Sequence, residues 1–356
     1  MKPTLPIFKL ALAGCLALAH TARAWDYEGH RVVNQLALAS LPTNFPAFVR
    51  TPAAQERIAF LSGEPDRWRN TPDFALQHFN NPDHYLDIEE LADFGLKPDD
   101  LTPFRYNFTV QMGLARAKHP EKFEPIDPEK NKDQTRQMAG FLPWAITEYY
   151  GKLKSGFSYL STYQQYGGTP EEIANAQANI IYVMGVMGHF VGDGSQPLHL
   201  TKHHHGWVGD NPKGYSTNRT FHSWIDGGYF RRIGGVKASD LASSIKPAQN
   251  VGNTNQPAGF FNSTMDYLMT TFTLVEPLYQ LEKENRLSSK GDIDPAGKTF
   301  LEERIVAGGQ MLGNIWYTAW INAHEDKYLR GELEKRQGRA AEPRPSTPPD
   351  AKVKGP

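Results

Sequence analysis

The 356-residue sequence contains a single cysteine, Cys15. Because Cys15 lies in an N-terminal segment that we expect to be removed, the mature chain would have no disulfide, and packing or bound metal would have to stabilise it. The sequence also lacks an excess of basic residues, and its formal net charge is −1. Proteins that grip nucleic acid with basic side chains alone are normally positively charged. A phosphate ligand would therefore have to be held by something else, for which metal ions are the obvious candidate.

Several sequence patterns that mark other fold classes are also absent. No stretch shows sustained alternation of apolar and polar residues, and no Asn-Gly pair lies between two apolar runs, so hairpins and sheets are not indicated. The sequence has no internal repeat and no glycine-rich phosphate loop. The length is sufficient for a large core. We therefore predict an all-α fold with a single mainly helical domain.

Apolar residues recur at helical spacing in several stretches that turn residues separate. From His222 onward the chain is again expected to be helical. Two segments are rich in Asp, Asn, Gly and Pro, and we expect them to be loops: residues 63–83 and 206–220. The pattern predicts the other helices over residues 28–41, 51–62, 108–118, 131–155, 170–192, 261–287 and 297–329.

The two ends of the chain differ in composition from the rest. Residues 1–24 have a basic start, a short apolar run and the small-x-small sequence Ala22-Arg23-Ala24, which is typical of a cleaved secretory signal. Cleavage there would make Trp25 the first residue of a secreted or periplasmic protein. Leu-Ala-Gly-Cys, ending at Cys15, is the alternative and would make a lipoprotein. Residues 335–356 are rich in proline and charge, so we predict a disordered tail after a domain that spans residues 25–334.

The most informative stretch is MGHFVGDGSQPLHL, residues 187–200. His189 and Asp193 lie four residues apart at the end of an apolar helix, so they share one helix face. The turn that follows would bring His199 back towards the same carboxylate. Burying such groups in an apolar core is costly, and a metal ion removes that cost. His222 and Asp226 repeat the spacing, and we predict a centre with more than one metal.

Other candidate ligands have weaker support when each is taken alone. Each of three pairs also has an ordinary structural interpretation. Packing could explain Trp25 and His30, a surface salt bridge could explain Asp66 and Arg69, and half-burial could explain His84 beside Asp87. The run His203-His204-His205 lies in a glycine-rich loop, and three adjacent imidazoles cannot all face one ion. We therefore interpret that run as a solvated or weakly metal-binding loop.

Taken in order, these positions resemble a known family. The chain resembles the zinc-dependent type I nucleases, the single-strand-specific S-one/P-one family, in five motifs. They are Trp25-x4-His30, Asp66-x2-Arg69, His84-Tyr-Leu-Asp87, His189-x3-Asp193-x5-His199 and His222-x3-Asp226. That family belongs to a trinuclear zinc superfamily that also contains bacterial zinc phospholipases C. The resemblance spans most of the mature chain. The chain departs from fungal and plant members in having no disulfides, and from most members in having Tyr85 where Phe is usual.

The resemblance implies a helical domain around three Zn²⁺ ions. One zinc would be held by Asp66, His84, His189 and Asp193. A second would be held by the amino and carbonyl groups of Trp25 together with His30 and Asp193, which would bridge the two ions. The third would take His199, His222 and Asp226. The resemblance also implies that Arg69 stabilises the transition state, that Tyr85 stacks on a base, and that Asp87 accepts hydrogen bonds from it.

The implied activity is hydrolysis of single-stranded DNA and RNA to 5′-nucleotides, with 3′-nucleotidase activity, by metal-activated hydroxide attack on phosphorus. Nucleic acid and 3′-nucleotides would be the substrates, and neither a stable protein partner nor a membrane-spanning helix is implied. Two alternatives remain open on the residues. One is a zinc-dependent phospholipase C, although such lipases tend to have Glu where this chain has Asp226. The other is a non-catalytic exported zinc-binding protein.

Overall fold

The computed structural model describes residues 25–252 and 258–341. The predicted signal segment, with the alternative acylation site at Cys15, lies outside the described residues, as do residues 342–356 of the predicted tail. Within the described ranges the regular structure is helical, and the one β-type contact is an isolated antiparallel bridge between Leu86 and Gly140. The prediction of an all-α fold in a single domain is therefore confirmed.

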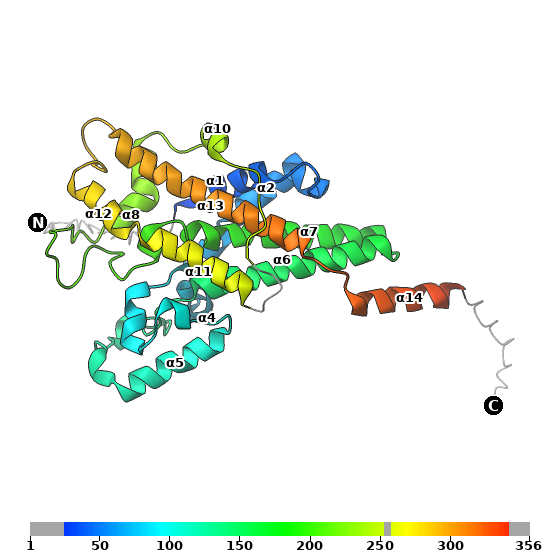
Figure 1. The fold of residues 1–356 in the computed structure, drawn as a ribbon, viewed down its shortest axis with the longest axis horizontal. Coiled ribbons are helices and arrows are strands. Elements are labelled where there is room, and N and C mark those ends of the chain that lie inside the picture. The colour runs from blue at the N-terminus through cyan, green and yellow to red at the C-terminus, as the bar shows by residue number, and fades with distance from the viewer. Residues whose placement is uncertain (1–24, 253–257, 342–356) are drawn as a thin grey trace, which may run out of the picture.

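Fourteen α-helices of very unequal length follow one another in the described part of the chain (Figure 1). They are α1 (Tyr27–Ser40), α2 (Pro52–Leu61), α3 (Glu64–Arg69), α4 (Phe74–Asn80), α5 (Arg105–Lys118), α6 (Leu142–Gln165), α7 (Pro170–Asp193), α8 (Phe221–Ser223), α9 (Tyr229–Arg232), α10 (Ala238–Leu241), α11 (Gly259–Phe272), α12 (Val275–Lys283), α13 (Pro295–Ile321) and α14 (Lys327–Ala341).

Short helical turns fill many of the connections. One of them, η8 (Trp224–Gly228), is a π-helix that joins α8 to α9 without a break. The others have 3-10 geometry: η1 (Ala47–Arg50), η2 (Asn81–His84), η3 (Ile88–Phe94), η4 (Pro98–Asp100), η5 (Pro120–Lys122), η6 (Pro128–Lys130), η7 (Pro197–His199) and η9 (Ala242–Ser244).

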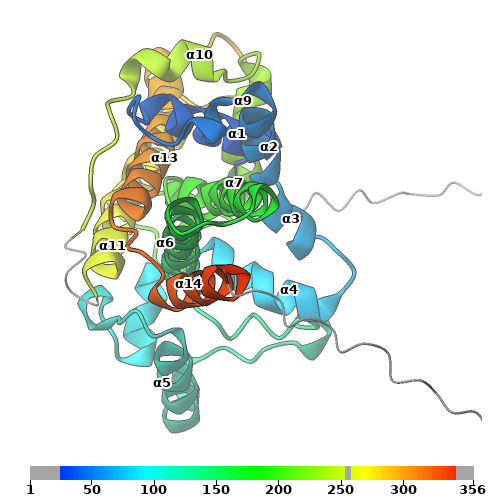
Figure 2. The same cartoon turned by 90° about the vertical axis from the view of Figure 1, so that its right-hand side faces the viewer.

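Helix α7 lies at the centre of the domain. It begins with a capping box, in which Thr169 and Glu172 satisfy each other's backbone N–H groups, and Pro170 occupies the first turn. Its second half, Met184–Asp193, is buried all round. Helices α1, α2, α6 and α13 pack against it and surround it in Figure 2. The apolar run of the sequence therefore marks the helix that is buried most deeply.

Helix α1 approaches α7 closely because small residues line their contact. A Cβ atom on Gly192 would lie 2.8 Å from Nδ1 of His30, and a Cβ on Gly188 would overlap the Asn34 side chain. The Asn34 amide donates to the carbonyls of Ile58 (2.8 Å) and Gly185 (3.0 Å). This buried amide links α1, α2 and α7, and fixes the position of His30 beside the end of α7.

The end of the described chain corrects the predicted start of the tail. Residues 335–341 belong to α14, which projects from the body of the domain (Figure 1). Arg330 pairs with Glu334 one turn later (2.8 Å), and Arg336 forms two 3.0 Å bonds to Glu172 in the first turn of α7. Leu333 in the same helix is fully buried, so packing holds α14 on the domain together with these ion pairs.

Three further stretches differ from the prediction. Residues 63–83 contain α3, α4 and η2 instead of a loop, because Pro65 and the Asp73 cap start helices locally. Residues 131–141 are not helical, and the stretch ends at Gly140, whose φ of 102° is left-handed. The predicted helix over 261–287 breaks between α11 and α12, where Pro277 cannot continue a helix from α11.

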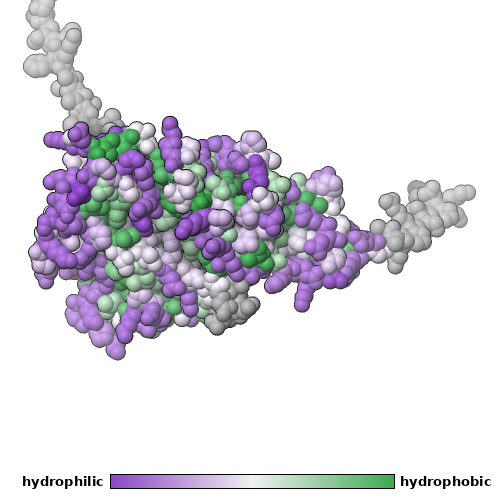
Figure 3. Space-filling model, turned by 45° about the horizontal axis from the view of Figure 1, so that its top comes forward, coloured by the Kyte–Doolittle hydropathy of each residue, from purple (hydrophilic) through white to green (hydrophobic). Residues whose placement is uncertain are grey.

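The surface of the domain is mostly polar. On the face shown in Figure 3, hydrophobic residues form small patches separated by hydrophilic ones. Among the helices of residues 25–252 and 258–341, none has both the length and the apolar character that crossing a membrane requires.

Candidate metal centre

Eight of the predicted ligand side chains converge at the C-terminal end of α7. They come from six separate elements, namely α1, α3, η2, α7, η7 and the α8–η8 turn, and all of them are buried. They form three groups in which the possible ligand atoms lie within 4.8 Å of one another. The groups are His30, His189 and Asp193; Asp66, His84 and His189; and His199, His222 and Asp226.

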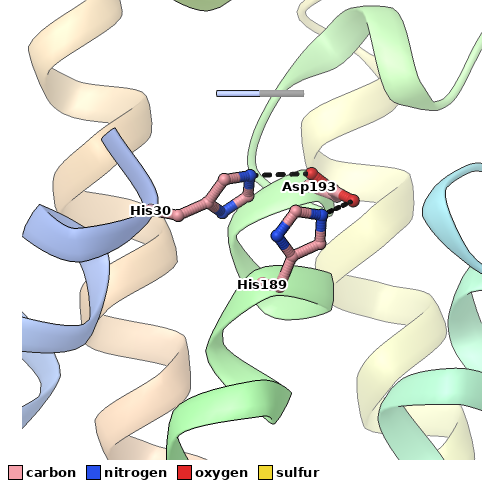
Figure 4. Close-up of side chains that lie close together, drawn as sticks. All are labelled: His30, His189 and Asp193. Carbon is pink, nitrogen blue, oxygen red and sulfur yellow. Dashed lines mark ion pairs between the residues drawn. The ribbon is translucent and has the colours of Figure 1, made fainter. Parts of the chain in front are cut away.

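Asp193 is the centre of the first group. Its Oδ1 lies 3.4 Å from Nε2 of His30, and its Oδ2 lies 3.4 Å from Nε2 of His189 (Figure 4). The two imidazole rings stack with their centroids 3.9 Å apart. Asp193 and His189 are one helical turn apart, as the sequence spacing predicts, and His30 reaches them because Gly192 leaves room for its ring.

The second group shares His189 with the first. Nδ1 of His84 lies 2.9 Å from Nε2 of His189 and 3.0 Å from Oδ2 of Asp193. Oδ1 of Asp66 lies 3.9 Å from the same nitrogen of His189. His84 ends η2, which Pro82 starts, and Asp66 lies in the first turn of α3. The four residues predicted to hold one ion therefore lie together.

The third group lies on the other side of the turn that follows α7. Nε2 of His222 lies 3.0 Å from Nε2 of His199 and 3.1 Å from Oδ2 of Asp226. Asp226 belongs to the π-helical turn η8, a feature that is frequent at functional sites. The Gln196 amide donates to the other oxygen of Asp226 at 2.6 Å. Gln196 therefore orients this carboxylate towards the histidines.

The hydrogen bonds of these groups fit metal ions. Nδ1 of His189 donates to the Ser62 carbonyl and Nδ1 of His199 donates to the His84 carbonyl, each at 2.7 Å. The lone pair on Nε2 of His189 and of His199 therefore faces other acceptor atoms. Metal-binding histidines have this arrangement. Several buried atoms have no hydrogen-bond partner: Nδ1 and Nε2 of His30, Oδ1 of Asp66, Nε2 of His84, Oδ1 of Asp193, Nδ1 of His222 and Oδ2 of Asp226. Mixed imidazole and carboxylate sets of this kind suit zinc.

Burial keeps the histidines in the form that binds a cation. It lowers the pKa of His30 and of His189 to about 4, and it lowers the pKa of His84 well below its usual range. These imidazoles are therefore neutral near pH 7. Burial also raises the pKa of Asp193 to about 8 and that of Asp226 well above its usual range. A cation in direct contact favours the ionised carboxylates and opposes that shift.

Trp25 lies beside the centre. Its indole is fully buried, and Nε1 donates to the carbonyl of Gly192 (3.0 Å) and to Oγ of Ser195 (3.2 Å). These two residues flank Asp193 and its following turn. The backbone N–H of the next residue, Asp26, donates to the carbonyl of Asp226 at 2.9 Å. The N-terminal residues of the described chain are therefore fixed next to the groups that they are predicted to complete.

The second and third groups border a cavity of about 320 Å³, which is lined by His84, His199 and His222 among others. Arg69 lines it, with Nη1 3.9 Å from Oδ1 of Asp66. Tyr85 lines it too, and its hydroxyl donates to the carbonyl of Met138 at 3.4 Å. Asp87 forms part of the wall but is 6% exposed, and its Oδ1 lies 3.7 Å from Nδ1 of His204. Asp87 therefore belongs to the cavity, not to the ligand groups.

The structure corrects the interpretation of the triple-histidine run. His203 is buried, and His204 and His205 line the cavity together with His199 and His222. No residue spacing links this loop to the metal-ligand groups, because the loop and the groups meet only in the folded structure. Glu90 and Arg136 also line the cavity and were not singled out. Gln196 lies in the stretch of residues 187–200 that the sequence marks as informative, but the sequence does not predict its contact with Asp226.

Comparisons with known proteins add little to this geometry. No family model matches the sequence, and no curated protein matches it. Among solved structures, the chain is similar to that of the alpha-toxin of Clostridium perfringens, isolated from the avian strain SWCP. The identity is 13%, the TM-score is 0.37, and the match covers 84% of this chain and 66% of the toxin chain. The chain thus spans slightly less than two thirds of the toxin's length, and a likeness at this level identifies neither a family nor a substrate.

Proposed function

We propose that the chain is a zinc-dependent hydrolase that cleaves single-stranded DNA and RNA to 5′-nucleotides and removes phosphate from 3′-nucleotides. The observation that supports this most is the set of three His/Asp groups, two of which border one cavity that Arg69 and Tyr85 also line. Phosphate diesters are highly charged and unreactive, and their hydrolysis is the reaction for which clustered metal ions are best suited.

We assign the residues to three zinc ions as the resemblance implies. One ion would be held by Asp66, His84, His189 and Asp193. Another would be held by His199, His222 and Asp226. The remaining ion would be held by His30, Asp193 and the main chain of Trp25. When bound, the ions supply acidification of water and neutralisation of phosphate charge. Asp193 would position two of the ions relative to each other, because its two oxygens face different histidines.

Arg69 supplies the cationic side chain closest to these groups in the cavity. Its contact with Asp66 is long, at 3.9 Å, so the guanidinium retains donors for a substrate. A guanidinium can bind two phosphate oxygens at once. In the proposed reaction Arg69 binds the oxygens on which negative charge develops, while the neutral imidazoles keep their lone pairs for the metal.

Tyr85 provides the apolar wall on which a nucleobase can stack. Its hydroxyl is directed to Met138, so the ring face is the part available to a ligand. A base reaches such a wall only when it is unstacked, which favours single strands over duplexes. Asp87 would accept hydrogen bonds from the base edge.

Phospholipid is the second candidate substrate, and one surface feature favours it. Tyr106, Val110 and Leu114 form a row along α5 and are 83%, 59% and 65% exposed. Helix α5 packs on η3, which contributes Glu90 to the cavity. An exposed apolar row of this kind is typical of helices that lie on lipid surfaces. The chemistry at phosphorus would be the same.

The two substrates are distinguished by assaying the zinc-loaded protein on both. We expect hydrolysis of single-stranded DNA and RNA, release of phosphate from a 3′-nucleotide, and much slower cleavage of duplex DNA. Cleavage of phosphatidylcholine with no action on nucleic acid would overturn the nuclease assignment. Stoichiometric zinc uptake without either activity would instead identify an exported zinc-binding protein.

We also propose that the chain is exported and that residues 1–24 are removed, so that the mature protein begins at Trp25. N-terminal sequencing of protein recovered from the producing cell tests this. A first residue at Trp25 is expected, since its free amino group would complete the zinc site of His30. An acylated Cys15 at the N-terminus would exclude that ligand and show a lipoprotein.

A further inference from the structure

The loop with the three histidines is fixed in place on both sides. Thr201 donates its hydroxyl to Glu89 at 2.5 Å, and the Lys202 N–H donates to the same carboxylate at 3.2 Å. The His203 ring stacks on Trp207, with centroids 3.9 Å apart and planes 6° apart. Nδ1 of His203 accepts the N–H of Val208 at 3.1 Å. His203 is thus a structural residue, and it holds its two neighbours at the cavity.

His204 is fixed through one edge of its ring. Its Nδ1 donates to the Thr201 carbonyl at 3.1 Å and lies 3.7 Å from Oδ1 of Asp87. Its Nε2 makes no hydrogen bond to any described residue, and the side chain lines the cavity. The free nitrogen is therefore available to a molecule in the cavity.

His205 lies next to it. The two rings are 4.6 Å apart between centroids, and Nδ1 of His205 is buried without a hydrogen-bond partner. The ring centroids of His204 and His205 lie 6.2 Å and 5.6 Å from that of His222 in the third metal group. A group bound by these two imidazoles would therefore lie beside the metal groups and not within them.

The carboxylates beside His204 favour the protonated form of its ring. Burial lowers the pKa of His204, but the Asp87 carboxylate, the Thr201 carbonyl and the charge of Glu90 outweigh that effect and leave the pKa raised. Burial lowers the pKa of His205 to about 4 and leaves that ring neutral. The protonated ring of His204 has an N–H at Nε2 that no described residue accepts. Such a donor forms a charge-assisted hydrogen bond with a phosphate oxygen.

We propose that His204 and His205 form a second phosphate subsite, which holds a substrate phosphate other than the one being cleaved. The proposal rests on the proposed function, because it takes the metal groups as the place of the scissile phosphate. A nucleotide that carries phosphates at both its 3′ and 5′ positions has the required chemistry. Asp87 is then a positioning residue for His204 as well as part of the wall.

Two substrates that differ in one phosphate test the subsite. We expect the full-length zinc-loaded protein to have a KM for adenosine 3′,5′-bisphosphate about tenfold lower than for adenosine 3′-phosphate, the scale of one charge-assisted hydrogen bond. In the H204Q variant the ratio of the two KM values should fall close to one. H205Q should reduce the ratio in the same direction and serves as the second variant if H204Q does not fold.

Lys202 supplies the matched control. It lies in the same loop and is exposed, and K202Q removes a positive charge without altering the cavity wall. A ratio that is equally lost in K202Q, or that is unchanged in both histidine variants, would overturn the subsite. If the wild-type protein hydrolyses neither substrate, the proposed function fails separately. Calorimetric binding of adenosine 3′,5′-bisphosphate to the same proteins then decides the subsite, because loss of binding in H204Q but not in K202Q still supports it.

Discussion

Asp193 is the residue on which the candidate metal centre depends most. It is fully buried, and its carboxylate lies within 4 Å of four imidazoles, those of His30, His84, His189 and His199. A single buried charge surrounded in this way needs a cation, because neutral imidazoles cannot compensate it fully. The residue is therefore expected to matter for stability as well as for activity.

Replacing Asp193 by Asn keeps its shape and removes its charge. We expect D193N to lose at least one zinc ion and more than about 100-fold in activity, since changing a group that only orients a metal ligand can already cost that much. In the presence of zinc it should also melt at a lower temperature than wild type. Metal analysis, the single-strand assay and a thermal melt measure these effects. D266N, at an exposed aspartate of α11, is the control. A D193N protein with full zinc and activity would contradict the bridging role.

Glu90 gives a prediction about pH. Burial, followed by the charges of Asp87 and Asp93, raises its pKa from 4.5 to about 7. The folded state then binds more protons than the unfolded state between these two values, so ionising Glu90 costs stability as the pH rises through 7. We expect the free energy of unfolding of E90Q, relative to wild type, to be more favourable at pH 8 than at pH 5. Denaturant unfolding at both pH values tests this, and an equal difference at the two would contradict the raised pKa.

At the scale of elements, the contact of α1 with α7 sets the geometry of the centre. Gly188 and Gly192 allow the two helices to approach, and Asn34 fixes their separation. A helix pushed away by one methyl group would move His30 from Asp193. The position of His30 and the stability of the packing between α1 and α7 are therefore linked.

The substitution G188A tests that link. The added methyl would overlap the Asn34 side chain, so we expect a loss of about 1–3 kcal/mol in the free energy of unfolding together with weaker zinc binding. G151A on α6 is the matched control, because nothing lies within 4 Å of the added atom, and it should be neutral or stabilising by up to about 1 kcal/mol. Equal behaviour of the two variants would show that the close contact is unimportant.

The sequence predicted elements well where periodicity and caps agreed. The predicted helix over 170–192 is α7, and the spacing of His189 and Asp193 placed both on one face as the structure has them. Composition misled in residues 63–83, where local caps form α3 and α4. The position of His204 could not be predicted, because Glu89 and Asp87 hold it from a segment more than 100 residues away.

At the scale of the whole molecule, metal binding and folding are expected to be coupled. The groups join six elements, and several of their buried nitrogen and oxygen atoms have no hydrogen-bond partner. A bound cation would satisfy these atoms and hold the six elements together. Removing the metal should therefore loosen the domain around α7.

A strong zinc chelator tests this coupling. At a zinc concentration about 1,000 times the dissociation constant, one site alone stabilises a fold by about 4 kcal/mol, so we expect the melting temperature to fall by roughly 5–10 °C on chelation. Added zinc should restore it, whereas magnesium should not, because these are nitrogen-rich sites. A melt that is unchanged by chelation would argue against structural metal.

The proposed ligand residues lie between positions 25 and 226, and α13 contributes none of them, although it packs against both α1 and α7. During synthesis the imidazole and carboxylate ligands therefore leave the ribosome before α13 exists. Helix α13, which packs against both α1 and α7, is made later. Stable metal capture is thus expected to follow the docking of α13, so a chain that ends before Pro295 would contain the eight ligand side chains but would lack the helix that packs against α1 and α7.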